Sequence, residues 1–278
     1  MSSALSLAQR AFYKESGYIV VPHLLQDAQI ERYLRRARQI VLGDHAPSAA
    51  VHLVRDINFT NGSLPMPEDP ELSMWKLLNP DRFDTVMAEC LELPQVLDVA
   101  GSLLGPDLLA FLLMFIYKPP GVAQSEHPFH QDGAYFHFAP LERGLGVWIP
   151  LDLADESNGG LSIIPGSHRL PIRKHSRIDG LNPGCFEADR IEELRTRAIS
   201  LQMSAGDAIF FDTRLLHRTG GNRTRRHRRV ITLHLASAHC RPTGPAIEQF
   251  RFRLVRGSTY EGCLQPYEEN VIDGTGKH

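Results

Sequence analysis

The feature that most constrains the fold of this chain is a series of short apolar segments that begins at residue 108. They are rich in β-branched and aromatic residues, and turns containing Gly, Pro and Asn separate them. Strands joined in this way are typical of an antiparallel sandwich or barrel, whereas βαβ units would place helices between them. The segments are LLAFLLMFIYK, GVWIPLDLA, LSIIP, AISLQM, DAIFFD and RVITLHLASA, within residues 108–238. We therefore predict an antiparallel β barrel or jelly roll.

The first hundred residues differ, because their apolar residues recur mainly at helical spacing. Helices are expected at 27–42, 81–93 and 94–105. Asp27 stands where an N-cap is expected, and Pro94 stands at the start of the third helix. A short strand is expected at 18–21, and residues 44–72, rich in Pro, Asn, Gly and Ser, indicate a long surface excursion.

The chain has no internal repeat and no low-complexity linker, so we interpret residues 1–278 as one domain. Helices over about 1–107 would support a β core over about 108–240. The extension 241–278 either caps the barrel or contacts a neighbouring subunit, and the pattern leaves the oligomeric state open. The predicted fold class is therefore α+β, mainly β with flanking helices.

Composition argues against several classes of partner. The net charge of −2 indicates no general attraction to nucleic acid or to a membrane surface. The basic run RTRRHRR at 223–229 contains no aromatic residues and accompanies no nucleic-acid-binding module, so a nucleic-acid patch is disfavoured. The apolar run 107–117 is too short to span a bilayer. Four distant cysteines without a CxxC pair indicate reduced thiols, and a cytoplasmic location is expected.

The segment HPFHQDGAYFHF (127–138) is the strongest candidate for chemistry. In a strand, His130 and Asp132 would project to the same face. They would supply one histidine and the carboxylate of a 2-His-1-carboxylate iron site. His217, which follows the buried strand DAIFFD, is the best candidate for the second histidine. An isolated HxD also occurs by chance, and the alternative is a polar stretch beside a core strand.

Three further features favour the iron site. Arg228 opens a strand predicted to lie beside the one that precedes His217, where it could hold a carboxylate through two parallel hydrogen bonds. The stretch SNGGLSIIPGSH (157–168) predicts a glycine turn, an apolar strand and a second tight turn. Trp148 lies in the next strand after the HxD motif, where its indole could line a pocket.

Together, three motifs resemble the phytanoyl-CoA dioxygenase family of Fe(II)/2-oxoglutarate oxygenases. They are MFIYKPPGVAQSEHPFHQDGAYFHF, GVWIPLDLADESNGGLSIIPGSHR and LLHRTGGNRTRRHRRVITLHLAS, and the resemblance extends over about residues 8–240. It implies a double-stranded β-helix core of the jelly-roll or cupin-like type. It also implies that the chain uses Fe(II), 2-oxoglutarate and O2, with ascorbate keeping the iron reduced.

The resemblance carries over to individual residues of this chain. It implies that iron is bound by His130, Asp132 and His217. It implies that Arg228 pairs with the distal carboxylate of 2-oxoglutarate and that Thr219 also touches this carboxylate. Further cosubstrate contacts are implied for Trp148, Met114 and Lys76, with the alignment loosest at Lys76.

The implied reaction couples oxidative decarboxylation of 2-oxoglutarate to hydroxylation of an aliphatic C–H bond, with release of succinate and CO2. Halogenating relatives replace the ligand carboxylate with a small residue, so Asp132 favours hydroxylation. Two alternatives remain: a metal-binding homologue without turnover, and a hydrolase or isomerase with zinc or another divalent ion. Zinc sites more often carry three histidines or an added glutamate, and Arg228 would then lack a partner.

The substrate is predicted only as a small molecule, an acyl-CoA or another anionic metabolite. Tyr135 and Phe136 could line its pocket or belong to the core. The basic loop 167–180, with Arg173 and Arg177, either covers the site and binds an anionic group or is a solvated surface loop. Of the remaining polar residues, His127 is expected in a loop, Gln131 and His137 facing away from the iron, and His168 and His234 as structural hydrogen-bonding residues.

Overall fold

The computed structural model describes residues 4–44 and 52–267. The α-helices are Leu7–Ser16 (α1), Asp27–Leu42 (α2), Ile57–Thr60 (α3), Thr85–Ala88 (α4) and Pro94–Leu104 (α5). The strands are Tyr18–Val21 (β1), His52–Arg55 (β2), Met74–Leu78 (β3), Leu108–Lys118 (β4), His127–His130 (β5), Phe138–Ala139 (β6), Gly144–Pro150 (β7), Leu161–Ile163 (β8), His175–Arg177 (β9), Phe186–Ala188 (β10), Ile199–Ser200 (β11), Ala208–Asp212 (β12), His217–Thr219 (β13), Arg228–Ser237 (β14), Arg241–Pro242 (β15) and Arg253–Arg256 (β16).

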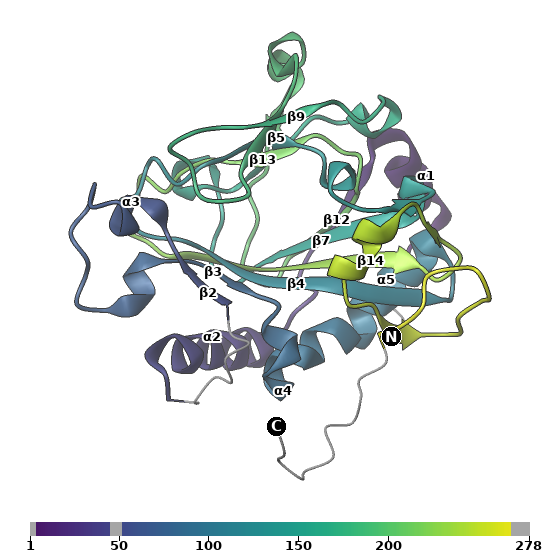
Figure 1. Ribbon diagram of the computed structural model, residues 1–278, viewed down its shortest axis with the longest axis horizontal. Helices are drawn as coiled ribbons and strands as arrows, with labels where there is room; N and C mark the ends of the chain where they lie inside the picture. Colours follow the sequence, from purple (N-terminus) through teal and green to yellow (C-terminus); the bar gives the residue numbers. More distant parts are fainter. Residues whose placement is uncertain (1–3, 45–51, 268–278) are drawn as a thin grey trace.

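Two antiparallel sheets form the core, as expected for a jelly roll. The larger has the order β1-β12-β7-β14-β4-β3-β2, with β16 also paired to β4, and the smaller has the order β11-β8-β13-β5. The expectation that the Arg228 strand, β14, lies beside the strand that precedes His217, β12, was wrong, because β7 lies between them. In Figure 1, β5 and β13 lie on one side of the large sheet, and α2 and α4 lie on the other. The predicted mainly β fold with supporting helices is therefore confirmed.

Alternation along the central strands decides which side chains face the helices and which face the second sheet. Phe115 of β4 lies opposite Ile231 of β14, and both belong to the main apolar core shared with α2 and α5. The next pair along, Met114 and Thr232, faces the other way and lines an internal cavity. Because side chains in a strand alternate between faces, the same two strands build the core and the cavity.

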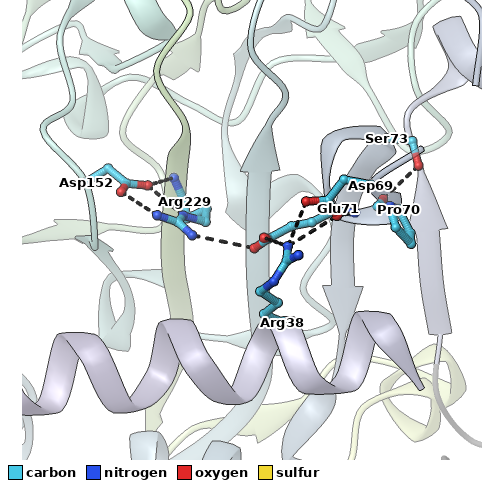
Figure 2. A network of polar contacts seen from close by, with 7 residues as sticks. All are labelled: Arg38, Asp69, Pro70, Glu71, Ser73, Asp152 and Arg229. Carbon is cyan, nitrogen blue, oxygen red and sulfur yellow. Dashed lines mark hydrogen bonds and ion pairs between the residues drawn. The ribbon is translucent and has the colours of Figure 1, made fainter. Parts of the chain in front are cut away.

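An ion network ties α2 to the outer face of the large sheet (Figure 2). Arg38 of α2 donates to Asp69 at 2.9 Å and to Glu71 at 2.8 Å. Glu71 also lies 3.5 Å from Arg229 of β14, whose guanidinium bonds Asp152 beyond the end of β7. The network thus fixes the start of β14 against its neighbouring elements.

Several sequence-based expectations for the N-terminal part were wrong. Residues 81–93 are not one helix: α4 lies between the 3₁₀ turns Pro80–Arg82 and Glu89–Glu92, because Asp84 caps a new start by accepting from the Met87 N–H. The strand β3 was not anticipated. Asp27 is the first helical residue, and Gln26 occupies the N-cap position.

The region 44–72 is only partly a surface excursion. Its described residues include β2, which pairs with β3, and three buried polar side chains: Asp56, Asn58 and Glu71. Residues 45–51 of this expectation lie outside the described residues. Buried polar groups need hydrogen-bond partners, and the region obtains them from distant segments that local composition does not reveal.

Candidate metal and cosubstrate site

The two sheets bring three predicted ligands together. His130 ends β5, and His217 begins β13 directly opposite it in the antiparallel pairing. Asp132 was expected to continue the strand, but it begins a 3₁₀ turn, Asp132–Ala134. The turn still directs its carboxylate toward the histidines, with Oδ1 3.4 Å from His130 Nε2 and 3.7 Å from His217 Nε2.

This group has the donor set of a divalent-metal site. Its ligand atoms all lie within 4.8 Å of one another, and all three residues are buried. His130 Nδ1 lies 2.8 Å from the Pro128 carbonyl, and His217 Nδ1 lies 2.9 Å from the Leu215 carbonyl. A carbonyl can only accept, so each Nδ1 carries the proton and each Nε2 keeps its lone pair for a metal.

The protonation states also suit a cation. Burial, with a further contribution from the His130 charge, lowers the pKa of His217 to about 4. Burial opposes ionisation of Asp132, but His217 and His234 hold its pKa well below the ordinary value. At neutral pH the site therefore offers the neutral imidazole of His217 and the ionised carboxylate of Asp132.

Two histidines near the ligands differ from expectation or go beyond it. His127 is not a loop residue: it belongs to β5, lines the cavity and stacks on His130 with ring centroids 3.9 Å apart. His234 does act as a hydrogen-bonding residue, but its partner is Asp132, whose Oδ2 lies 2.9 Å from His234 Nε2. Arg228 and His234 stand an even number of residues apart on one strand, so their side chains face the same way. This spacing is the sequence signal that could have placed His234 in the cavity with Arg228.

One cavity of about 230 Å³ contains the ligand group and the other predicted contacts. The predicted residues that line it are His130, Asp132, His217, Arg228, Thr219, Trp148, Met114, Lys76, Tyr135 and Phe136. The same cavity is also lined by residues that we did not single out, among them Leu112, Lys118, Thr232 and Phe250. Long-range strand pairing therefore assembles nearly the whole predicted set.

Arg228 is the least satisfied group in this cavity. Its side chain is fully buried, and within the described part of the chain none of its guanidinium nitrogens has a hydrogen-bond partner. Burial lowers its pKa to about 9, with Asp152 acting in the opposite sense, so it is still protonated at neutral pH. A buried, unpaired cation is costly unless an anion joins it. The three metal-ligand residues, His130, Asp132 and His217, together with this arginine thus fit a 2-oxo acid that carries a second carboxylate.

Comparisons with known proteins agree with this geometry. The model of the family described as "Phytanoyl-CoA dioxygenase (PhyH)" matches residues 13–230. The peroxisomal phytanoyl-CoA dioxygenase of Bos taurus is 30% identical over 243 residues, which cover 86% of this chain and 71% of that protein. The chain belongs to the phytanoyl-CoA dioxygenase family.

Solved structures agree at the level of fold. EctD from S. alaskensis with bound Fe has a TM-score of 0.68 and 23% identity, covering 88% of this chain and 82% of that one. The epimerase SnoN, in complex with Fe3+, alpha ketoglutarate and nogalamycin RO, has a TM-score of 0.66 and 22% identity, covering 86% and 87%. As a phytanoyl-CoA dioxygenase family member, the chain is an Fe(II)- and 2-oxoglutarate-dependent oxygenase, and the expected iron and 2-oxoglutarate are confirmed.

In this family member, the basic residues of loop 167–180 do not reach the cavity. The Arg173 guanidinium donates to the carbonyls of Asp189, at 2.7 Å, and Arg190, at 3.0 Å. Arg177 lies on β9 and is exposed. Gln131 points away, as expected, and its Oε1 accepts from the Arg173 backbone N–H at 2.9 Å.

Among the described residues, no helix is long and apolar enough to cross a bilayer.

Proposed function

We propose that this protein hydroxylates an aliphatic C–H bond of a small molecule, with 2-oxoglutarate and O2 consumed and succinate and CO2 released. The observation that carries the proposal is the Arg228 guanidinium, which lacks a hydrogen-bond partner among the described residues and lies in the same cavity as the His130–Asp132–His217 group. In our proposal, Arg228 and Thr219 receive the distal carboxylate of 2-oxoglutarate. Trp148, Met114 and Lys76 complete that subsite.

Bound iron would supply the activation of O2, and the side chains have other tasks. His130, Asp132 and His217 would hold the metal, and their three ligand atoms would leave coordination capacity for the cosubstrate. Apolar side chains exclude water from the reacting C–H bond. As a metal ligand, Asp132 would take the place that a halide would need, which favours hydroxylation.

The substrate is proposed to present an acyl or other aliphatic group to the metal. Leu112, Tyr135, Phe136 and Phe250 supply the apolar part of the lining. A cavity of about 230 Å³ is smaller than most ligand sites, so a molecule as large as an acyl-CoA would leave most of its length outside.

An anionic group outside the cavity would meet the basic loop 167–180. Arg177 is free to contribute by its exposure, whereas Arg173 already bonds two carbonyls. Relatives at 30% identity are named phytanoyl-CoA dioxygenases, which favours acyl-CoA in the first panel of compounds. The cytoplasmic location stays part of this proposal, although those relatives are named as peroxisomal.

The test measures succinate released from 2-oxoglutarate by protein loaded anaerobically with Fe(II) and then exposed to air. The panel contains acyl-CoAs, free carboxylic acids, amino acids and phosphonates. We expect stimulation by one compound class, lost in His130→Ala and kept in the control His137→Ala, whose side chain does not line the cavity. Equal succinate from wild type and His130→Ala would support the homologue without turnover. Conversion of a panel compound by zinc-loaded protein, without succinate release, would support the hydrolase or isomerase alternative.

A further inference from the structure

Two cationic side chains lie directly opposite each other in the cavity wall. Lys118 ends β4, Arg228 begins β14, and the antiparallel register pairs them. Such opposed residues lie on one face of the sheet, with Cβ atoms about 5 Å apart. Lys118 is 1% exposed and Arg228 is 0% exposed, so water does not screen their repulsion. Like charges in this relationship destabilise a sheet.

The surroundings of Lys118 do not neutralise it fully. Its Nζ donates to the Ser125 carbonyl, one of the three hydrogen bonds that an ammonium can donate. Ser125 in turn donates through its hydroxyl to the buried carboxylate of Asp56. Asn58 and Asn182 also donate to the same carboxylate. Among the described residues, Lys118 therefore has donor capacity left over beside an arginine whose guanidinium has no hydrogen-bond partner.

The protonation state of the Lys118 amine depends on pH near neutrality. Burial and the Arg228 charge lower its pKa to about 7, whereas Cys185, Asp56 and Glu126 act in the opposite direction. Near neutral pH the amine is consequently a mixture of charged and neutral forms. An anion that arrived between Lys118 and Arg228 would favour the charged form of both.

We propose that Lys118 joins Arg228 in receiving the distal carboxylate of 2-oxoglutarate, so that the cosubstrate binds together with a proton. The inference rests on the proposed function, which uses Arg228 without Lys118. A carboxylate has two oxygens and about four acceptor positions, so it can accept from a guanidinium and an ammonium at once. The cosubstrate then supplies the charge that this pair lacks.

Lys76 is the other lysine in the cavity and the alternative carrier of the proton. It stands on β3, opposite Ile116 of β4, and burial lowers its pKa to about 8. Its Nζ lies 3.7 Å from the Trp75 ring centroid and 3.9 Å from Met114 Sδ. It does not stand opposite Arg228, so we assign the proton to Lys118.

The experiment is calorimetric titration of the Fe(II)-loaded protein with 2-oxoglutarate, without O2, in paired buffers of different ionisation enthalpy. A pKa of about 7 for Lys118 predicts uptake of about 0.9 proton at pH 8 and about 0.1 at pH 6. The Kd should weaken about tenfold from pH 6 to pH 8, because the neutral amine must first take up a proton.

Three variants assign the proton. Lys118→Met should bind 2-oxoglutarate without proton uptake and about tenfold more weakly at pH 6, and Lys118→Arg should bind it tightly, also without uptake. Lys76→Met should keep the uptake. If Lys118→Met does not fold, the wild-type pH series and Lys118→Arg still decide.

Two results would overturn the inference and leave the proposed function intact. One is 2-oxoglutarate binding by the wild type without proton uptake. The other is uptake that disappears in Lys76→Met and persists in Lys118→Arg. Failure of the Fe(II)-loaded wild type to bind 2-oxoglutarate at any pH would instead contradict the proposed function, and the inference with it.

Discussion

His234 and the metal-ligand histidines contact different oxygens of Asp132. His234 Nε2 lies 2.9 Å from Oδ2, whereas Oδ1 is the oxygen nearest His130 and His217. A hydrogen bond on one oxygen fixes the carboxylate rotamer and directs the other oxygen toward the metal position. His234 therefore supports the ligand although it does not belong to the ligand group.

The first prediction follows from this contact. His234→Ala should weaken Fe(II) affinity about 10- to 100-fold, the usual effect of losing a group that orients a ligand. Competition with a metal chelator under anaerobic conditions measures it. The matched control is His239→Ala, because His239 also contacts a carboxylate, Asp107 at 3.3 Å, away from the metal group. Equal affinities for the two variants would contradict the role of His234.

The second prediction concerns Arg228, whose buried guanidinium has no hydrogen-bond partner in the part of the chain that the structure describes. Arg228→Met should leave the metal-free protein as stable as the wild type, or more stable by about 1–4 kcal/mol, because it removes an uncompensated charge. The same substitution should weaken 2-oxoglutarate binding by about 2–5 kcal/mol, which corresponds to at least about 30-fold. Thermal unfolding and calorimetric titration measure the two effects. Loss of stability together with unchanged affinity would show that Arg228 is structural.

The third prediction concerns the neighbouring Arg229, whose replacement should lower stability and leave 2-oxoglutarate affinity largely unchanged, unlike that of Arg228. Arg229 donates to Asp152 through its backbone N–H and through its guanidinium, at 2.8–2.9 Å. Figure 2 shows how Glu71 links this pair to Arg38. Arg229→Met should lower the free energy of unfolding by about 2–3 kcal/mol, below the cost for a fully buried pair, since both side chains are partly exposed. The affinity of the folded variant for 2-oxoglutarate should change far less than in Arg228→Met.

The metal group could be predicted from sequence because its signals are local. His130 and Asp132 stand two residues apart, and His217 directly follows a short apolar strand and turn. The core strands were predictable for the same reason, since β-branched runs and turn residues are visible within ten residues. The family resemblance then supplied the cosubstrate residues, which local spacing alone does not identify.

The groups that sequence analysis missed depend on strand register. Lys118 matters because it lies opposite Arg228, and these two residues are far apart in the chain. His127 was expected in a loop, but it begins β5 and pairs with Thr219 of β13. Residues 81–93 had a helical apolar pattern, but Asp84 caps a shorter helix inside it. In each case a long-range partner or a cap overrides the local preference.

The fourth prediction gives the pH dependence of the Asp152–Arg229 pair. Burial raises the pKa of Asp152, but the hydrogen bonds from Arg229 and its charge together lower this pKa by more, so the net shift is downward. A carboxyl with a lower pKa in the folded state contributes stability above its unfolded pKa, about 3.9, and loses it as pH falls through the folded value.

Asp152→Asn should therefore cost about 2 kcal/mol at pH 7, and the difference from the wild type should shrink below about pH 4. Urea unfolding across pH 3–7 measures this. Glu92→Gln is the control, because its pair with Arg253 is about half exposed on both sides and should show little difference. A difference between wild type and Asp152→Asn that stayed constant down to pH 3 would exclude the ionised carboxylate as its cause.

The fifth prediction concerns Asn182, which joins the segment 165–197 to the N-terminal part of the chain. Its Oδ1 accepts from the Ile57 N–H at 2.8 Å, and its Nδ2 donates to Asp56 Oδ2 at 2.8 Å. Both Asn182 and Asp56 are buried, so losing the amide leaves the carboxylate short of a donor. Such a loss costs about 1–3 kcal/mol.

Asn182→Ala should therefore increase local opening of this segment, which is rich in arginine, and trypsin should cleave it about 5- to 150-fold faster under conditions where reclosing outpaces cleavage. Asn61→Ala serves as control, since this exposed side chain accepts from Ser63 within its own turn. Mapping the cleavage sites by mass spectrometry decides the interpretation. Faster cleavage throughout the chain would indicate global destabilisation and contradict the prediction, whereas cleavage confined to 165–197 would mean that Asn182 holds this segment against the rest of the fold.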